Sequence, residues 1–110
     1  MRELNLDRLR TLVTIADLGS FAEAARTLHL APPTVSLHIA DLEASIGAPL
    51  LVRKRGEVRP SGAGEVLVER ARRLLADADE AMDLVRRQVQ GLEGRVRLGA
   101  STGAIAHLLP

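Results

Sequence analysis

Apolar residues in the first part of the chain follow the period of about 3.6 residues that is typical of α-helices, and glycine and proline divide this pattern into short segments. Residues 6–18 carry one apolar stripe and stop at Gly19. Ser20, with Glu23 three residues later, makes a capping box that opens a second helix. Helices this short are stable only when their apolar stripes pack on one another. The sequence therefore predicts a small helical bundle.

A third helix begins at about Pro32 or Pro33 and stops at Gly47. Its inward stripe has spacings of four, three and four residues and consists of Val35, Ile39, Leu42 and Ile46. At about 100° per residue, the outward face consists of Pro33, Leu37, Ala40, Asp41 and Ala44, with Thr34 and Ser36 beside it and His38 near its inner edge. Two short helices joined by the turn HLA are typical of a helix-turn-helix.

The segment PLLVRKRGEVRP, residues 49–60, is predicted to form two short strands around a turn at Gly56. It holds half of the eight cationic side chains in the first 60 residues, namely Arg53, Lys54, Arg55 and Arg59. The net charge of the chain is only +1, so this local cluster, rather than the total, indicates a nucleic-acid partner. A basic hairpin after three helices forms a winged helix-turn-helix, whose recognition helix enters the major groove while the wing contacts phosphates.

A long helix is predicted from Ser61 to about Gln90. A heptad seam runs along it and consists of Leu67, Ala71, Leu74, Ala78, Ala81 and Val85. A second stripe, repeating every seven residues, consists of Val68, Leu75, Met82 and Val89. A helix with two apolar faces leaves one in water unless a partner covers it. We therefore predict that one face packs on the winged domain and that the seam forms a homodimer.

Composition argues against several classes of function. The chain has no cysteine, so it offers neither a disulfide framework nor a thiolate metal site. It has no long apolar run and no basic leader, so we expect a cytoplasmic protein without a membrane partner. His38 and Asp41 could bind a metal only with further ligands that the pattern lacks. Without a nucleophile–base set or a phosphate-binding loop, we expect no enzyme activity and no cofactor.

Three motifs occur in register: Gly-Ser-Phe-x-x-Ala-Ala-x-x-Leu, Pro-x-x-Ser-x-x-Ile-x-x-Leu-Glu, and an Arg-rich wing followed by Ala-Gly. With them, residues 4–93 resemble the N-terminal DNA-binding domain and linker helix of LysR-type transcriptional regulators. The resemblance implies a mostly α-helical fold: a winged helix-turn-helix followed by a long dimerisation helix. It also implies a bacterial regulator that binds double-stranded DNA as a homodimer on an interrupted palindrome.

The start of the third helix departs from the family pattern. Family members commonly have Ser-Gln-Pro at this start and Ser-Arg-Gln inside the helix, where this chain has Ala-Pro-Pro and Ser-Leu-His. Ala31 has no capping oxygen and the two prolines have no N–H, so anion binding would fall to Thr34 and the amide of Val35. Leu37 offers a thymine methyl contact or has no role. The predicted DNA-contacting residues are Pro32, Pro33, Thr34, Ser36, Leu37, His38, Arg53, Lys54, Arg55 and Ser61.

The sequence divides into a winged domain at 1–60, a linker and dimerisation helix at 61–91, and a third part at 92–110. The third part, with a predicted strand from Arg95 to Leu98, resembles the start of the family's effector-binding domain; otherwise it is a flexible tail. In a full-length member, Ser101 and Thr102 would contact a small-molecule effector. The alternatives left open are a fragment of a longer regulator, a stand-alone binder, and a coiled-coil protein-interaction module whose winged domain contacts protein.

Overall fold

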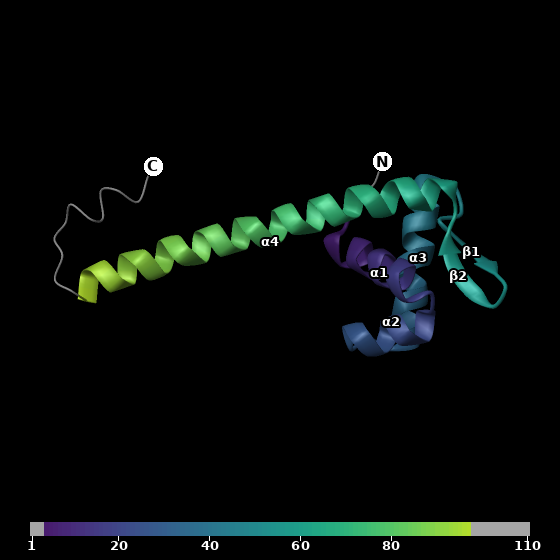
Figure 1. Ribbon diagram of the computed structural model, residues 1–110, viewed down its shortest axis with the longest axis horizontal. Helices are drawn as coiled ribbons and strands as arrows, with labels where there is room; N and C mark the ends of the chain where they lie inside the picture. Colours follow the sequence, from purple (N-terminus) through teal and green to yellow (C-terminus); the bar gives the residue numbers. More distant parts are fainter. Residues whose placement is uncertain (1–3, 98–110) are drawn as a thin grey trace. The chain divides into compact units, whose positions relative to one another are not determined.

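The computed structural model describes residues 4–97, with side-chain surroundings as far as Gly91. The elements in chain order are α1 (Leu6–Leu18), α2 (Phe21–Leu28), α3 (Pro32–Ile46), β1 (Leu51–Lys54), β2 (Glu57–Pro60) and α4 (Gly62–Arg97) (Figure 1). This order confirms the predicted fold class, three helices with a hairpin wing and then a long helix. Contacts divide the chain into two units, and the division falls within α4 after Leu75.

The helix ends follow the predicted stop and start signals. Gly19 and Gly47 end α1 and α3 with φ of +70° and +81°, a left-handed conformation that suits glycine. The Ser20 hydroxyl accepts the amide of Glu23 at 3.1 Å and so caps α2. The Glu23 carboxylate pairs with Arg26 instead of completing the capping box. Local chemistry therefore accounts for these helix ends, whereas α2 ends at His29, a non-glycine residue with a left-handed φ of +58°.

The core of the first unit lies where the three helices, the hairpin and the first turns of α4 meet. Its buried members are Leu9, Leu12, Ile15, Ala24, Ala25, Val35, Ile39, Leu42, Leu50, Val58, Val68 and Ala71. The small side chains of Ala24 and Ala25 let α2 pack closely on its neighbours. The prediction that Ile46 is in the core is wrong, because the last turn of α3 is incompletely covered and leaves Ile46 43% exposed.

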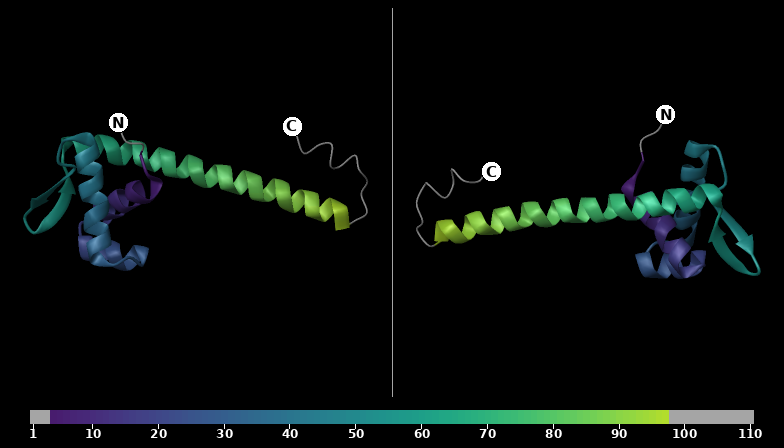
Figure 2. Two further views of the ribbon diagram at one scale, coloured as in Figure 1. Left: turned by 180° about the vertical axis from the view of Figure 1, so that it is seen from behind. Right: turned by 45° about the horizontal axis from the view of Figure 1, so that its top comes forward.

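The wing is a tight two-stranded hairpin. Lys54 pairs with Glu57, so Arg55 and Gly56 form a two-residue loop. Their φ values of +53° and +81° define a type I′ turn, which matches the twist of antiparallel strands. Val58 is 5% exposed and anchors β2 in the core. The hairpin projects beyond the helices with its basic loop at the tip (Figures 1 and 2).

The first turns of α4 belong to the same unit as the wing. Gly64, Val68, Ala71 and Leu75 face the core at spacings of four, three and four residues. Gly64 lies against the backbone of Leu50, where a Cβ would come within 1.9 Å of the carbonyl oxygen. The prediction that Ala71 belongs to the dimer seam is wrong, because its side chain is fully buried in its own domain.

The described part of the second unit is the continuation of α4. The helix passes Gly91 and Gly94 and ends at Arg97, so the predicted strand is wrong over residues 95–97. A glycine costs a helix only about 1 kcal/mol relative to alanine, which does not stop a helix that is already propagating. No helix among residues 4–97 is long and apolar enough to cross a membrane. The remaining strand residue Leu98 and the predicted effector contacts Ser101 and Thr102 lie outside the described residues.

Replacement of Gly64 tests the close approach of α4 to the wing base, the residues Leu50 and Ser61 that flank the hairpin. We expect Gly64→Ala to lower the free energy of unfolding by about 1–3 kcal/mol, because the new methyl group overlaps a backbone carbonyl. Gly62→Ala is the matched control, since a Cβ there meets nothing within 4 Å. Urea denaturation followed by circular dichroism measures both. Equal stabilities of the two variants would contradict the described packing.

Candidate nucleic-acid interface

The outward face of α3 carries small and apolar side chains. Leu37 lies at its centre and is 57% exposed. The exposed side chains around it are those of Pro33, Ser36, Ala40 and Ala44, and Thr34 is half-buried beside them. Of these side chains, only the hydroxyls of Ser36 and Thr34 can form hydrogen bonds. This face can therefore contact a groove by shape, methyl contact and two hydroxyls.

The first turn of α3 has few amides to offer to an anion. Ala31 makes no side-chain cap, and Pro32 and Pro33 lack N–H groups. The amides of Thr34 and Val35 both donate to the carbonyl of Ala31, at 2.9 and 3.3 Å. The prediction that these two amides bind an anion is therefore wrong, because the helix itself uses them. The Thr34 hydroxyl is the donor that this helix start can present.

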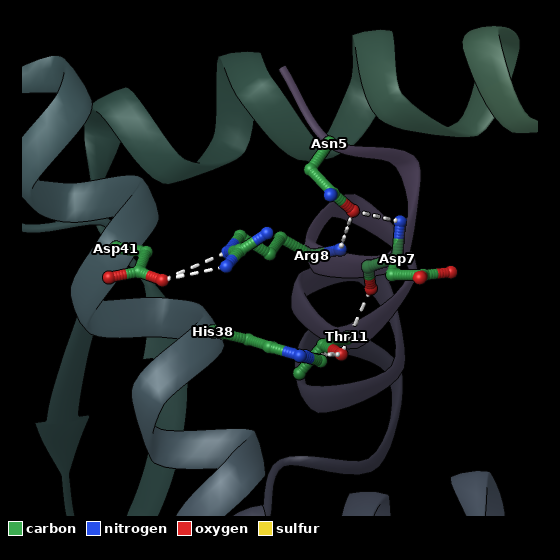
Figure 3. A network of polar contacts seen from close by, with 6 residues as sticks. All are labelled: Asn5, Asp7, Arg8, Thr11, His38 and Asp41. Carbon is green, nitrogen blue, oxygen red and sulfur yellow. Dashed lines mark hydrogen bonds and ion pairs between the residues drawn. The ribbon is translucent and has the colours of Figure 1, made fainter. Parts of the chain in front are cut away.

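His38 faces α1 instead of the centre of the outward face. Its Nδ1 lies 2.8 Å from the hydroxyl oxygen of Thr11, a buried residue (Figure 3). The Thr11 hydroxyl donates its single hydrogen to the carbonyl of Asp7 at 3.1 Å. The tautomer of His38 decides which of the two groups donates in the Thr11–His38 contact. His38 thus uses one nitrogen to hold α3, and Nε2 is the nitrogen left for a DNA contact.

Asp41 also faces α1, so its predicted place on the outward face is wrong. Arg8 donates from Nε and Nη2 to one carboxylate oxygen of Asp41, at 3.0 and 2.9 Å (Figure 3). This half-buried ion pair neutralises a carboxylate that would otherwise repel phosphates. Together with the Thr11–His38 contact, it forms two braces between α1 and α3, one helical turn apart.

Sequence reasoning missed the two α1 partners. Arg8 and Thr11 are three residues apart, as are His38 and Asp41, and this matched spacing was the available signal. The braces occupy the two residues considered as metal ligands. Among the described residues, no group of three or more histidine, aspartate or glutamate side chains could hold a metal ion.

The wing presents three cations without an ion-pair partner among the described residues. Arg53, Lys54 and Arg55 are exposed, and within residues 4–91 none of them forms an ion pair. Arg59, in contrast, pairs with Glu57 at 3.0 Å. Arg55 takes a positive φ that arginine rarely adopts, and it lies in the two-residue loop at the hairpin tip. Three unpaired cations on one short hairpin suit contact with a polyanion.

Ser61 caps α4, which changes its expected role. Its hydroxyl oxygen accepts the amide of Gly64 at 3.0 Å, and its hydrogen is donated to the carbonyl of Pro49 at 2.7 Å. A hydroxyl has one hydrogen to donate, so none remains for a phosphate. The prediction of Ser61 as a phosphate contact is therefore wrong for the structure described.

Sequence reasoning also missed Glu43, which accepts the amide of Leu50 at 2.7 Å.

Two contacts show how α4 is used inside the first unit. Leu67 packs partly against the core. Arg72 pairs with Asp17 of α1, and this hydrogen bond is the main cause that raises the pKa of Arg72 above its ordinary value. The rest of the predicted seam, Leu74, Ala78, Ala81 and Val85, is exposed except for the half-buried Ala78. An apolar stripe at heptad spacing therefore faces water in the single chain.

A family model described as "Bacterial regulatory helix-turn-helix protein, lysR family" matches residues 6–65, which include the three helices, the wing and the start of α4. The chain belongs to the lysR family. Residues 6–65 contain all the predicted DNA contacts of this lysR-family chain, so the match covers the whole candidate interface.

Two similar proteins of known name are regulatory proteins. The nitrogen assimilation regulatory protein nac of Klebsiella aerogenes is 38% identical over 103 residues, which cover 94% of this chain and 34% of that protein. The small neutral protease regulatory protein of Streptomyces coelicolor is 38% identical over 99 residues, which cover 90% of this chain and 30% of that protein. The chain spans about a third of the length of these relatives.

Solved structures with the same fold include complexes with DNA. The complex of the BenM DNA-binding domain with catB site 1 DNA has a TM-score of 0.76 at 31% identity and covers 80% of this chain and 98% of that chain. The complex of the CbnR DNA-binding domain with DNA has a TM-score of 0.70 at 31% identity, with 76% and 97% covered. The winged fold of this lysR-family chain is thus similar to domains solved on DNA.

Two threonines of α1 test whether the Thr11–His38 brace stabilises the fold. Thr11 and Thr14 each donate to a carbonyl four residues earlier, but only Thr11 also contacts His38. We expect Thr11→Val to lower the free energy of unfolding by about 1 kcal/mol more than Thr14→Val, the value of one hydrogen bond. Urea denaturation at neutral pH measures the difference. Equal losses would show that the brace contributes nothing to stability.

Proposed function

We propose that this chain is the DNA-binding part of a bacterial transcriptional regulator and that it binds double-stranded DNA sequence-specifically as a homodimer. The main support comes from the wing, where Arg53, Lys54 and Arg55 are exposed and have no ion-pair partner among the described residues. A recognition helix with an open outward face is joined to this wing in the same compact unit. Family membership and the likeness to domains solved on DNA support the proposal.

The two surfaces take different parts in binding. In this proposal α3 enters the major groove, while the wing contacts phosphates beside it. The wing supplies most of the affinity, since each neutralised phosphate releases counterions. Pro32 and Pro33 pack against the groove wall without donating hydrogen bonds, and the Nε2 of His38 faces a phosphate or a base edge.

Sequence discrimination by α3 is weak in this proposal. Leu37 contacts a thymine methyl group, and the hydroxyls of Thr34 and Ser36 bond to base edges or phosphates. The outward face has no arginine, asparagine or glutamine, so it lacks the bidentate base contacts that are each worth about 1–3 kcal/mol of discrimination. DNA shape and the placement of two half-sites therefore contribute much of the specificity.

The exposed stripe on α4 supports the homodimer. Leu74, Ala78, Ala81 and Val85 are spaced four, three and four residues apart, which suits packing on the same stripe of a second copy. A two-fold dimer presents two recognition helices and two wings, and the linker between them leaves a gap in the DNA site. The expected operator is thus an interrupted palindrome.

We further propose that the chain acts within a longer cytoplasmic regulator, since its relatives are about three times as long. In that protein, residues 1–60 bind DNA, residues 61–91 link and dimerise, and residues 92–110 begin an effector-binding domain. Ser101 and Thr102 would then contact a small-molecule effector. The proposal assigns the chain no catalytic residue, cofactor or membrane partner.

Neutralising the wing tests the proposed function. We expect log K for duplex DNA to fall steeply with log salt, and Arg53→Ala/Arg55→Ala to reduce this slope by about 1.8, or about 0.9 for each phosphate contact. Arg86→Ala/Arg87→Ala removes the same charge outside the winged domain and should leave the slope unchanged. Fluorescence anisotropy across a salt series measures all three proteins. A salt-insensitive wild type, or equal slopes for both double variants, would contradict the proposal.

A further inference from the structure

Glu43 joins the recognition helix to the wing. This residue lies in the second half of α3 and is half-buried. One of its carboxylate oxygens accepts the amide of Leu50 at 2.7 Å and lies 3.4 Å from the amide of Leu51. Leu51 is the first residue of β1. A side chain of α3 therefore holds the two residues from which the wing starts.

The opposite side of the wing base is held by the start of α4. The carbonyl of Leu50 accepts the amide of Ser61 at 2.9 Å, and the Leu50 side chain is fully buried. The Ser61 hydroxyl donates to the carbonyl of Pro49. Gly64 lets α4 approach the carbonyl of Leu50 closely. Leu50 precedes β1 and Ser61 follows β2, so these contacts clamp both ends of the hairpin.

A hairpin this short is positioned by its base together with Val58 of β2, which is buried in the core. Each strand has four residues, and an isolated two-stranded hairpin is only marginally stable. The Glu43 side chain supplies the oxygen that accepts the Leu50 amide at this base. Loss of this acceptor leaves the amide of buried Leu50 without a partner. The wing base would then lose its hydrogen bond to α3, while buried Val58, whose amide donates to Gly19 at 3.1 Å, still holds β2 on the core.

We propose that Glu43 is a positioning residue for DNA binding: its carboxylate sets where the cations of the wing stand relative to the outward face of α3. The inference rests on the proposed function and adds the residue that couples its two contact surfaces. Glu43 itself touches no DNA in this account, and its negative charge is unfavourable beside phosphates. Its contribution comes from the wing base.

Two conservative variants separate hydrogen bonding from charge. Glu43→Gln removes the charge and keeps an oxygen of the same reach. Glu43→Asp keeps the charge but is shorter by one methylene, so it cannot span to the Leu50 amide without moving α3. A positioning role predicts that glutamine preserves binding and aspartate impairs it. A charge effect alone predicts that glutamine raises the affinity for DNA, because it removes a carboxylate near phosphates, and that aspartate leaves the affinity unchanged.

The first measurement uses the 110-residue chain without DNA. Amide hydrogen exchange at Leu50 should be about tenfold faster in Glu43→Asp than in the wild type, the equivalent of about one buried hydrogen bond. Exchange in Glu43→Gln should stay within about threefold of the wild type. Circular dichroism confirms that each variant is folded. An unchanged rate in folded Glu43→Asp would overturn the proposed hold on the wing base.

The second measurement is the salt series with duplex DNA. In Glu43→Asp, the slope of log K against log salt should fall by about 0.9 for each wing cation that no longer contacts a phosphate. Glu43→Gln should keep the wild-type slope. In the Arg53→Ala/Lys54→Ala/Arg55→Ala background, Glu43→Asp should change the slope no further, because the three wing contacts are already absent. A further loss there, or a wild-type slope for Glu43→Asp alone, would overturn the positioning role.

A wing that does not contact DNA would give a different result from a Glu43 that does not hold the wing base. If Arg53→Ala/Arg55→Ala keeps the wild-type slope while Glu43 is intact, the wing does not contact phosphates. That outcome contradicts the proposed function and, with it, the role of Glu43 in DNA binding. The exchange rates still report separately whether Glu43 holds the wing base.

Discussion

The packing around Leu50 holds together the three parts of the winged unit. The Leu50 side chain is fully buried, its amide donates to Glu43 of α3, and its carbonyl accepts from Ser61 at the start of α4. Gly64 makes room for this carbonyl, because any larger residue would overlap it. The packing of the recognition helix, the wing and the first turns of α4 on one another therefore involves one backbone segment. The unpaired cations of the wing can act with α3 because this segment is rigidly held.

Local chemistry made much of this fold predictable. Gly19 and Gly47 mark helix ends in the sequence because glycine adopts the left-handed conformation that ends a helix without steric cost. Pro32 marks the start of α3 because its fixed φ suits the first helical position. The basic turn before Gly56 identified the wing. Each of these signals acts within a few residues, so one sequence carries it.

The site was less predictable, because its details arise between elements. Helical angles placed Asp41 outward, but the long side chain of Arg8 draws its carboxylate toward α1. Ser61 was recognised as a helix start, yet its partner Pro49 lies twelve residues away. The heptad pattern identified an apolar face on α4 without saying what covers it, and the winged domain itself covers Ala71. Long-range pairing of this kind leaves little trace in a single sequence.

The central claim is that the wing supplies affinity while an α3 without arginine discriminates bases weakly. Selection of bound sites from random duplexes tests it most directly, with the wild type and Leu37→Arg compared at one salt concentration. The account predicts two inverted half-sites separated by an unselected gap, weakly specified in the wild type and enriched in guanine at one position in the variant, because arginine binds guanine bidentately. No enrichment for the wild type, or the same sites for both proteins, would contradict it.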